Sequence, residues 1–369
     1  MLKEIKIDGN ENIKLHGRMP KGGYPVPLFF NYSGVEINCD GSEAWIDIEV
    51  GNGFHEPWIA VEINGELMER RRLMQGDTTV CLFRSMTKGV VKNVRFYREL
   101  QAMEEDTDVF LAVKSLRTDG ELYPVKERKL KLEFIGDSIT SGEGTYGTVP
   151  DTDWLAMYMS ASRDYAVLTG KALDADVRIF SQGGWGVYVG WDNNLLHNIP
   201  SVYKPVCGLC KGGRNEELGA FQPNDFEAWK PDAIIVNLGT NDNSSFSQPA
   251  FDVPGIGMSK MRLTEDGDYL PEDIAKVEKA VYNFLKELRE LNPTSHIVWA
   301  YGMLGCKMDP VISGAMDRYS KDFNDTNVSM LKLPEVREET YGAHMHPGYA
   351  NHIEASKTVA DYLKKHFNL

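Results

Sequence analysis

Four residues, spread over more than two hundred positions, have the types that ester cleavage by an activated serine requires. Ser138 lies in "FIGDSITSGEG" (134–144), and His346 lies in "YGAHMHPGYANH" (341–352). Because a serine hydroxyl is a weak nucleophile at neutral pH, it needs a base within hydrogen-bond reach, and His346 is the candidate. The oxyanion formed on attack needs N–H donors, which we expect from the Ser138 amide, the Gly184 amide in "SQGGWGV" and the Asn241 side chain in "NLGTND". These residue types predict acyl transfer through a covalent acyl-serine.

A parallel sheet is the element that would bring these residues together. Near-continuous apolar runs occur at 132–136, 177–183, 233–239, 296–302 and 328–333, as expected for strands covered on both faces. Helical patterns lie between them, at about 153–173, 271–291, 310–323 and 349–366. Alternating strands and helices predict a doubly wound α/β fold, whose ligand site lies at the carboxyl ends of the strands. Ser138, Gly184 and Asn241 all follow predicted strands at that edge.

The first 125 or so residues have a different rhythm. Short segments with alternating apolar residues are separated by Gly, Asn and Asp, and none of them has the pattern of a long amphipathic helix. Asn64-Gly65 is a hairpin signal, because both turn residues must accept a positive φ. We therefore predict a β-sandwich over residues 1–127, followed by the α/β domain over residues 128–369.

The motifs carry a resemblance to a known superfamily. "GDSIT" at Ser138, a later glycine at Gly184, "GTND" at Asn241 and "HP" at His346 resemble, in order, the four spaced motifs of the SGNH (GDSL-type) hydrolases. An amino-terminal β-sandwich containing "LHGRMP" further resembles carbohydrate esterase family two, which has a jelly-roll-like domain ahead of the catalytic one. The resemblance implies an α/β/α catalytic domain, a catalytic serine and histidine, and an oxyanion hole of glycine and asparagine. It also implies acetyl esters of plant polysaccharides and their oligosaccharides as substrates, and no metal or organic cofactor.

One position departs from the superfamily pattern. The superfamily has an aspartate three residues before the histidine, whereas this chain has Ala343 there. That carboxylate fixes the imidazole tautomer and stabilises the imidazolium. Some members of the resembling family use a Ser–His dyad with a backbone carbonyl as the partner of the histidine, and we predict the same arrangement for His346. Asp137 and Asp242 are alternative acids, although carboxylates beside a nucleophile more commonly brace the loop.

Two long segments of the α/β domain, about 184–230 and 242–270, have surplus loop, and such loops are often functional. Trp185 follows the oxyanion glycine, and an aromatic face provides a platform for a sugar ring. Asp242 follows Asn241 directly. We therefore predict Trp185 and Asp242 as substrate contacts.

Other motifs in the chain favour less specific interpretations. "GEGTYG" (142–147) satisfies a dinucleotide-binding string, but it begins too far after its strand, so we expect a glycine-rich loop over Ser138. His344, His346 and His352 have no standard spacing for metal ligands on one helix face, so metal-assisted hydrolysis is the less favoured alternative. Cys207 and Cys210 lack a second ligand pair, and we expect buried loop thiols.

Composition limits the partners. The chain has 40 Lys and Arg against 54 Asp and Glu, and its net charge of −14 disfavours nucleic acids and anionic membranes as partners. The start of the chain lacks the apolar core of a signal peptide, and the five cysteines are sparse, so a cytoplasmic location is expected. No oligomeric state is predicted.

The predicted function is therefore serine esterase activity on acetylated oligosaccharides of the xylan or mannan type. Two alternatives remain open. The motifs also permit a lipid or lysophospholipid esterase, and Ala343 permits a non-catalytic glycan-binding protein with a decayed triad.

Overall fold

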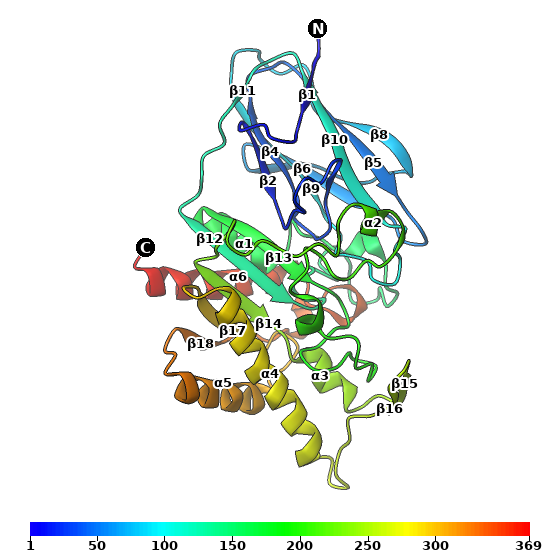
Figure 1. Ribbon diagram of the computed structural model, residues 1–369, viewed down its shortest axis with the longest axis vertical. Coiled ribbons are helices and arrows are strands. Elements are labelled where there is room, and N and C mark those ends of the chain that lie inside the picture. Colours follow the sequence, from blue (N-terminus) through cyan, green and yellow to red (C-terminus); the bar gives the residue numbers. More distant parts are fainter.

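The computed structural model describes the whole chain, residues 1–369. An N-terminal part built only of strands (β1 to β11) lies at one end of the long axis, and a C-terminal α/β part (β12 to α6) lies at the other (Figure 1). The two parts meet along one side of the α/β part, near β12, β13 and α1. None of the helices combines the length and the apolar character needed to cross a bilayer.

The N-terminal part consists of two antiparallel sheets. The first contains, in spatial order, β1 (Lys3–Lys6), β10 (Phe110–Thr118), β5 (Ala44–Gly51) and β8 (Gly76–Phe83), with β3 (Val26–Pro27) also paired to β10. The second contains β11 (Leu122–Tyr123), β4 (Gly34–Cys39), β9 (Lys92–Arg98), β6 (Trp58–Ile63) and β7 (Glu66–Arg72), with β2 (Ile13–His16) paired to β4. One buried cluster of 23 residues takes apolar side chains from strands of both sheets. Asn64 (φ 53°) and Gly65 (φ 86°) form the turn between β6 and β7, so the predicted hairpin is confirmed.

The C-terminal part is built on a five-stranded parallel sheet, as predicted. Its spatial order is β13 (Ala175–Ser181), β12 (Leu130–Gly136), β14 (Ala233–Asn237), β17 (His296–Tyr301) and β18 (Val328–Lys332). The strands begin and end within a few residues of the apolar runs in the sequence. Because all five run in the same direction, their carboxyl ends share one edge of the sheet.

Helices cover both faces of this sheet. Phe134 of β12 points to the face that packs against α1 (Tyr165–Leu173) and α6 (Tyr349–Phe367), and its neighbour Ile135 points to the face covered by α4 (Pro271–Leu291) and α5 (Asp309–Phe323). The predicted helix at 153–173 is wrong in its first half, which contains only the short 3-10 helix η1 (Ala156–Tyr158). Asp164 explains the late start of α1, because its carboxylate caps the helix by accepting the Ala166 N–H.

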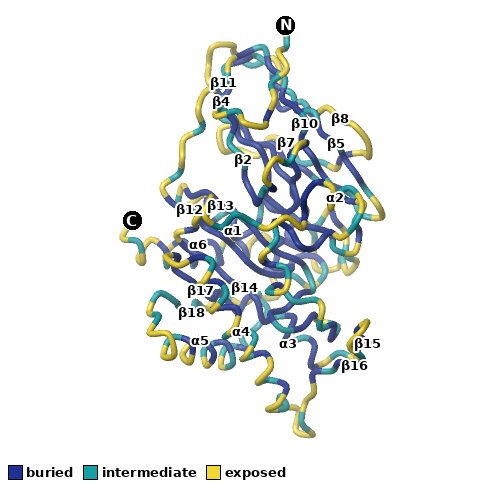
Figure 2. Tube along the Cα trace, in the orientation of Figure 1, coloured by how far each residue is buried: buried dark blue, intermediate teal, exposed yellow.

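The remaining elements are short and lie in connections. They are η2 (Ile199–Val202), α2 (Gly213–Glu217), α3 (Thr240–Ser245), the hairpin β15 (Phe251–Val253) and β16 (Gly257–Ser259), η3 (Glu338–Thr340) and η4 (Ala343–Met345). Figure 2 shows that the strands of all three large sheets are mostly buried, whereas the β15–β16 hairpin is largely exposed.

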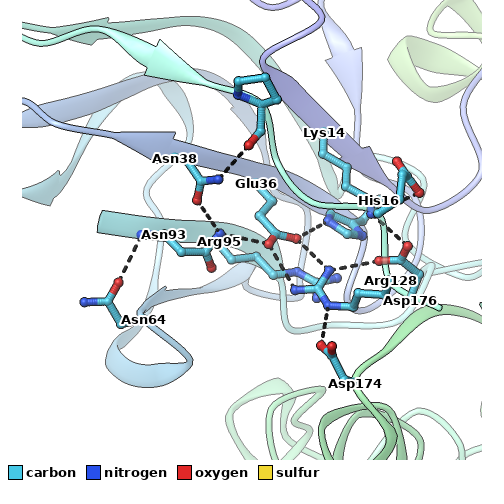
Figure 3. A network of polar contacts seen from close by, with 12 residues as sticks. Lys14, His16, Glu36, Asn38, Asn64, Asn93, Arg95, Arg128, Asp174 and Asp176 are labelled. Atoms are coloured by element: carbon cyan, nitrogen blue, oxygen red, sulfur yellow. Dashed lines mark hydrogen bonds and ion pairs between the residues drawn. The ribbon is translucent and has the colours of Figure 1, made fainter. Parts of the chain in front are cut away.

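A polar network joins the two parts at the β12–β13 side of the sheet (Figure 3). The Arg128 guanidinium donates to both carboxylate oxygens of Glu36, at 3.0 Å each, and to Asp176 at 2.9 Å. Lys14 donates to the other oxygen of Asp176 at 2.7 Å, and His16 Nε2 lies 2.7 Å from Glu36. Charges from β2, β4, the connection and β13 therefore neutralise one another where the two parts meet.

Candidate active site

The side chains of Ser138 and His346 lie in contact although they are 208 positions apart. Ser138 stands two residues after the last residue of β12, at the carboxyl edge of the sheet, and His346 lies just before α6. The distance from His346 Nε2 to Ser138 Oγ is 2.8 Å, which is hydrogen-bond distance. The fold therefore places an imidazole where it can accept the serine proton.

A backbone carbonyl orients the imidazole. His346 Nδ1 lies 2.6 Å from the carbonyl oxygen of His344, only two residues earlier. His344 (φ 51°) and Met345 (φ 56°) are both in the left-handed region, and this tight turn brings the carbonyl back to the ring. With Nδ1–H donating to that carbonyl, Nε2 is left unprotonated and faces Ser138. This geometry agrees with the predicted dyad with a backbone acceptor.

The position of the missing aspartate is buried and tightly packed. Ala343 is fully buried, and its Cβ packs against the backbone of Gly147. Its N–H donates to the Gly144 carbonyl at 3.1 Å, so the loop before His346 is paired directly to the loop after Ser138.

A different carboxylate, that of Glu143, occupies this region, and no sequence motif indicated it. Glu143 is 5% exposed, and its Oε1 lies 2.6 Å from His344 Nδ1 and 3.6 Å from His346 Nδ1. It stands between Gly142 (φ 74°) and Gly144 (φ 80°), in the glycine-rich string that we predicted to lie over Ser138. The sequence feature that could have indicated Glu143 was an acidic residue inside a glycine-rich loop close to the nucleophile.

Two backbone amides are free to bind an oxyanion. Neither the Ser138 N–H nor the Gly184 N–H has an acceptor within the protein. Gly184 has a φ of 77°, a conformation that favours glycine. The Asn241 side chain lines the same cavity, but its amide nitrogen already donates to Asp137 Oδ2 at 3.1 Å and to the Trp185 carbonyl at 2.9 Å. Asn241 therefore has to share an N–H with the oxyanion.

Asp137 braces the turn that carries Ser138. Its carboxylate accepts the Ile139 N–H at 3.0 Å as well as the Asn241 amide, and it has no hydrogen bond to His346. Burial raises the pKa of Asp137 to about 7, and the charges of Asp242 and Glu143 act in the same direction. The contacts of Asp137 and its raised pKa support a role in bracing the turn over the role of a displaced triad acid.

The predicted substrate contact at Asp242 is wrong. Asp242 is fully buried, and its carboxylate accepts the backbone N–H groups of three consecutive residues, 187–189, at 2.8 to 3.2 Å. It therefore holds the loop after Gly184 in place.

Trp185 is also a core residue, 6% exposed, with its ring stacked on His197. The predicted sugar platform at Trp185 is wrong for the same reason, since its ring does not line the cavity.

Ser138 and His346 open into a cavity of about 370 Å³. Only two of its twelve lining residues are hydrophobic, and these are Trp154 and Trp191. Trp191 is 48% exposed and lies against Gly184, where it takes the place that the sequence predicts for Trp185. The cavity is therefore a polar space with two aromatic walls, which suits a sugar better than an alkyl chain.

The N-terminal part supplies one wall of this cavity through Gln101 and Glu105. Gln101 Oε1 accepts the Gly183 N–H at 2.8 Å and the Ser141 hydroxyl at 2.7 Å. A residue from the connection after β9 therefore positions the backbone on both sides of the candidate oxyanion hole.

The structure sets His352 apart from His344 and His346, and it buries Cys207 and Cys210. Glu143, His344 and His346 form a group whose nitrogen and oxygen atoms lie within 4.8 Å of one another, but both nitrogens of His346 are already engaged, with the His344 carbonyl and with Ser138. His352 stands apart, fully buried, with its Nδ1 accepting the Tyr165 N–H. Cys207 and Cys210 are buried in the core between loop and sheet, as predicted.

Comparison with known proteins gives the class of this chain. A family description of GDSL-like lipases and acylhydrolases matches residues 132–344, which include Ser138, Gly184 and Asn241. The chain belongs to this family.

Particular relatives are carbohydrate esterases. The chain is 49% identical to the acetyl xylan esterase Est2A of the rumen bacterium Butyrivibrio proteoclasticus, with a TM-score of 0.98 over 100% of this chain and 99% of that one. A family two carbohydrate esterase from Clostridium thermocellum, solved with cellohexaose, has the same fold, with a TM-score of 0.78 and 21% identity over 96% of this chain and 99% of that one. An acetylxylan esterase/glucomannan deacetylase of Cellvibrio japonicus is 29% identical over 59% of this chain.

The match spans only part of each of these curated relatives. The chain spans 58% of the Cellvibrio enzyme, and 37% of the cellulase/esterase CelE of Acetivibrio thermocellus, to which it is 24% identical over 90% of its own length.

Proposed function

We propose that this chain is a carbohydrate O-acetyl esterase that cleaves its substrate through an acyl-enzyme on Ser138. The observation that carries the proposal is the 2.8 Å contact between Ser138 Oγ and His346 Nε2 at a cavity with free N–H donors. The near-complete match to a structure described as an acetyl xylan esterase supports acetate as the acyl group and carbohydrate as the alcohol.

The reaction proceeds in two halves. Ser138 Oγ attacks the acetyl carbonyl carbon while its proton passes to His346 Nε2. The oxyanion of the tetrahedral intermediate accepts from the Ser138 and Gly184 amides and from Asn241. His346 then returns the proton to the departing sugar oxygen, and acetyl-Ser138 remains. In the second half, water attacks the acetyl carbon while His346 Nε2 takes one of its protons. The bond from that carbon to Ser138 Oγ then breaks, His346 returns the proton to Oγ, and acetic acid leaves and ionises to acetate.

The shape and polarity of the cavity favour a sugar ester over a lipid ester. A lipid substrate needs a continuous apolar surface for its chain, and Trp154 and Trp191 are the only hydrophobic lining residues. Their rings are suited to stack on the apolar faces of pyranose rings, while Gln101, Glu105 and Gln182 offer partners for hydroxyl groups. We propose xylo- and manno-type oligosaccharides as the substrates.

We further infer that the N-terminal part is a jelly-roll-like β-sandwich, with the boundary to the catalytic domain between residues 127 and 128. The 23-residue core shared by its two antiparallel sheets supports this architecture. Its contribution of Gln101 and Glu105 to the cavity favours a role in shaping the site.

The test is acetate release from a panel of acetylated xylo- and manno-oligosaccharides, with Ser138→Ala as the nucleophile variant. Ser201→Ala removes an exposed serine hydroxyl in η2 and is the matched control. We expect wild type and Ser201→Ala to release acetate equally and Ser138→Ala to release none. A series of nitrophenyl esters should show a preference for acetate over longer chains. If fluorophosphonate does not label Ser138 in the wild type, the site is non-catalytic and the proposal fails.

A further inference from the structure

The region where the superfamily aspartate is missing contains one buried negative charge, on Glu143. Its carboxylate lies 3.6 Å from His346 Nδ1, on the side of the ring opposite Ser138. The same oxygen lies 2.6 Å from His344 Nδ1. At these distances the carboxylate forms a short-range ion pair with either imidazole when that ring is protonated.

His344 holds the carboxylate and His346 together. The rings of His344 and His346 are parallel, with centroids 5.4 Å apart and an interplanar angle of 5°. The carbonyl of His344 is the acceptor of His346 Nδ1, and its ring is the partner of Glu143. One residue therefore links the acid to the candidate base through its backbone and its side chain.

The carboxylate is held in its charged form. Burial alone would raise the pKa of Glu143, but the neighbouring imidazoles of His346 and His344 outweigh it, and the pKa lies below its ordinary value. The hydrogen bond to Glu143 in turn raises the pKa of His344. At neutral pH a negative charge therefore stands behind the imidazole of His346.

We propose that Glu143 is the positioning residue that replaces the absent aspartate: it fixes His346 through His344 and stabilises the imidazolium formed when His346 takes the Ser138 proton. This role rests on the proposed function, because it concerns the same proton transfer. Glu143 also lines the cavity, but its carboxylate makes no hydrogen bond to the Ser138 hydroxyl, so its effect on the proton transfer passes through the two histidines.

Other charged groups near this site are less suited to the role. Glu105 also lines the cavity, but 57% of its side chain is exposed and it contacts His55. Asp153 is exposed, and its charge raises the pKa of His344. The carboxylate of Asp137 accepts hydrogen bonds from the Ile139 N–H and the Asn241 side chain. The remaining titratable neighbour, His352, is buried, and its pKa is lowered to about 3 by burial, so it carries no charge at neutral pH.

The test compares two variants that each remove one negative charge near His344. Glu143→Gln keeps the shape of the side chain and an oxygen that can accept from His344. Asp153→Asn is the matched control, since it removes an exposed charge close to the same histidine. For each variant kcat, KM and the pH profile of kcat/KM are measured with 4-nitrophenyl acetate, and the melting temperature is recorded.

We expect Glu143→Gln to lower kcat about ten- to a hundredfold with KM within about twofold, less than the roughly 10⁴-fold loss for a directly bonded triad aspartate. Without the carboxylate the imidazolium is less favoured, so the acidic limb of kcat/KM should move to lower pH by about one unit. Asp153→Asn should behave as wild type. An unchanged kcat, or a lower kcat with an unmoved acidic limb, overturns the proposal, because the second result is what a purely structural role produces.

If Glu143→Gln does not fold, Glu143→Asp decides the question, because it keeps the charge on a shorter side chain. The proposal expects the acidic limb to stay at its wild-type position in that variant, and a shift there refutes it. Failure of the proposed function gives a different result: the wild type would be inactive, or Ser138→Ala would be as active as the wild type.

Discussion

Gly144 is the residue at which a single methyl group should displace His346. It has a φ of 80°, and a Cβ built on its backbone would lie 2.5 Å from the Ala343 carbonyl oxygen and 2.8 Å from His346 Cβ. Neither neighbour is the flexible end of a long side chain. Gly144→Ala should therefore push the backbone that carries His346 away from Ser138.

The size of the effect follows from these distances. Ordinary van der Waals contact needs about 3.4 Å or more, so His346 and Ala343 have to move by roughly 0.6 to 0.9 Å. A misplacement of about 1 Å in a reacting group costs about a hundredfold in rate. We expect kcat/KM to fall by about that factor. The positive φ adds a separate loss of about 1 to 2 kcal/mol in the free energy of unfolding, because an alanine Cβ is unfavourable there.

Gly89 separates these two effects. It has the same φ, 80°, but a Cβ there would have nothing within 4 Å. Gly89→Ala should lose only the φ-dependent part of the free energy of unfolding, about 1 to 2 kcal/mol by urea titration, and keep full kcat/KM on 4-nitrophenyl acetate. The reasoning is refuted if the two variants have kcat/KM values within twofold of each other at equal folded fractions.

Three further outcomes are expected. Burial and Arg95 lower the pKa of His16 to about 4, so the unfolded chain binds a proton more readily between pH 6.5 and 4, and the free energy of unfolding should fall by up to about 3 kcal/mol as pH drops through that window. His16→Gln should flatten this dependence in urea titrations at a series of pH values, and an unchanged slope would contradict the assignment. Asp242→Ala leaves three N–H groups, two of them buried, without their acceptor, so unfolding should become easier by at least about 2 kcal/mol, with lower kcat. Gln101→Ala should lower kcat/KM about tenfold and make unfolding easier by about 1 kcal/mol or more, because the Gly183 N–H loses its acceptor.

The sequence predicted the parts of the site that depend on strand ends. Ser138, Gly184 and Asn241 each follow an apolar run, and parallel strands bring their carboxyl ends to one edge whatever the connecting loops do. His346 was predicted because serine chemistry needs a base and because its "HP" motif, just before the last helical pattern, resembles the fourth motif of the superfamily.

The errors came from treating sequence neighbours as neighbours in the cavity. Trp185 and Asp242 adjoin site residues, but the turn after Gly184 directs the indole into the core, and α3 begins so that Asp242 points at the backbone of that turn. Trp191 reaches the cavity because its loop folds back, with its N–H donating to the Gly184 carbonyl. Glu143 was missed because its partner, His344, lies 201 positions away and no local pattern relates the two.

The site cannot be assigned to the α/β part alone. Arg98 of β9 is buried and donates to the carbonyls of Leu100 and Gln101, and so fixes the segment that carries the Gln101 side chain. Gln101 in turn accepts the N–H of Gly183, the residue before the candidate oxyanion glycine. At the other end of the same contact surface, Arg128 and its carboxylate partners hold the two parts together. Because a shift of the N-terminal part would be transmitted through Gln101 to Gly183 and Gly184, the β-strand part is a structural component of the active site.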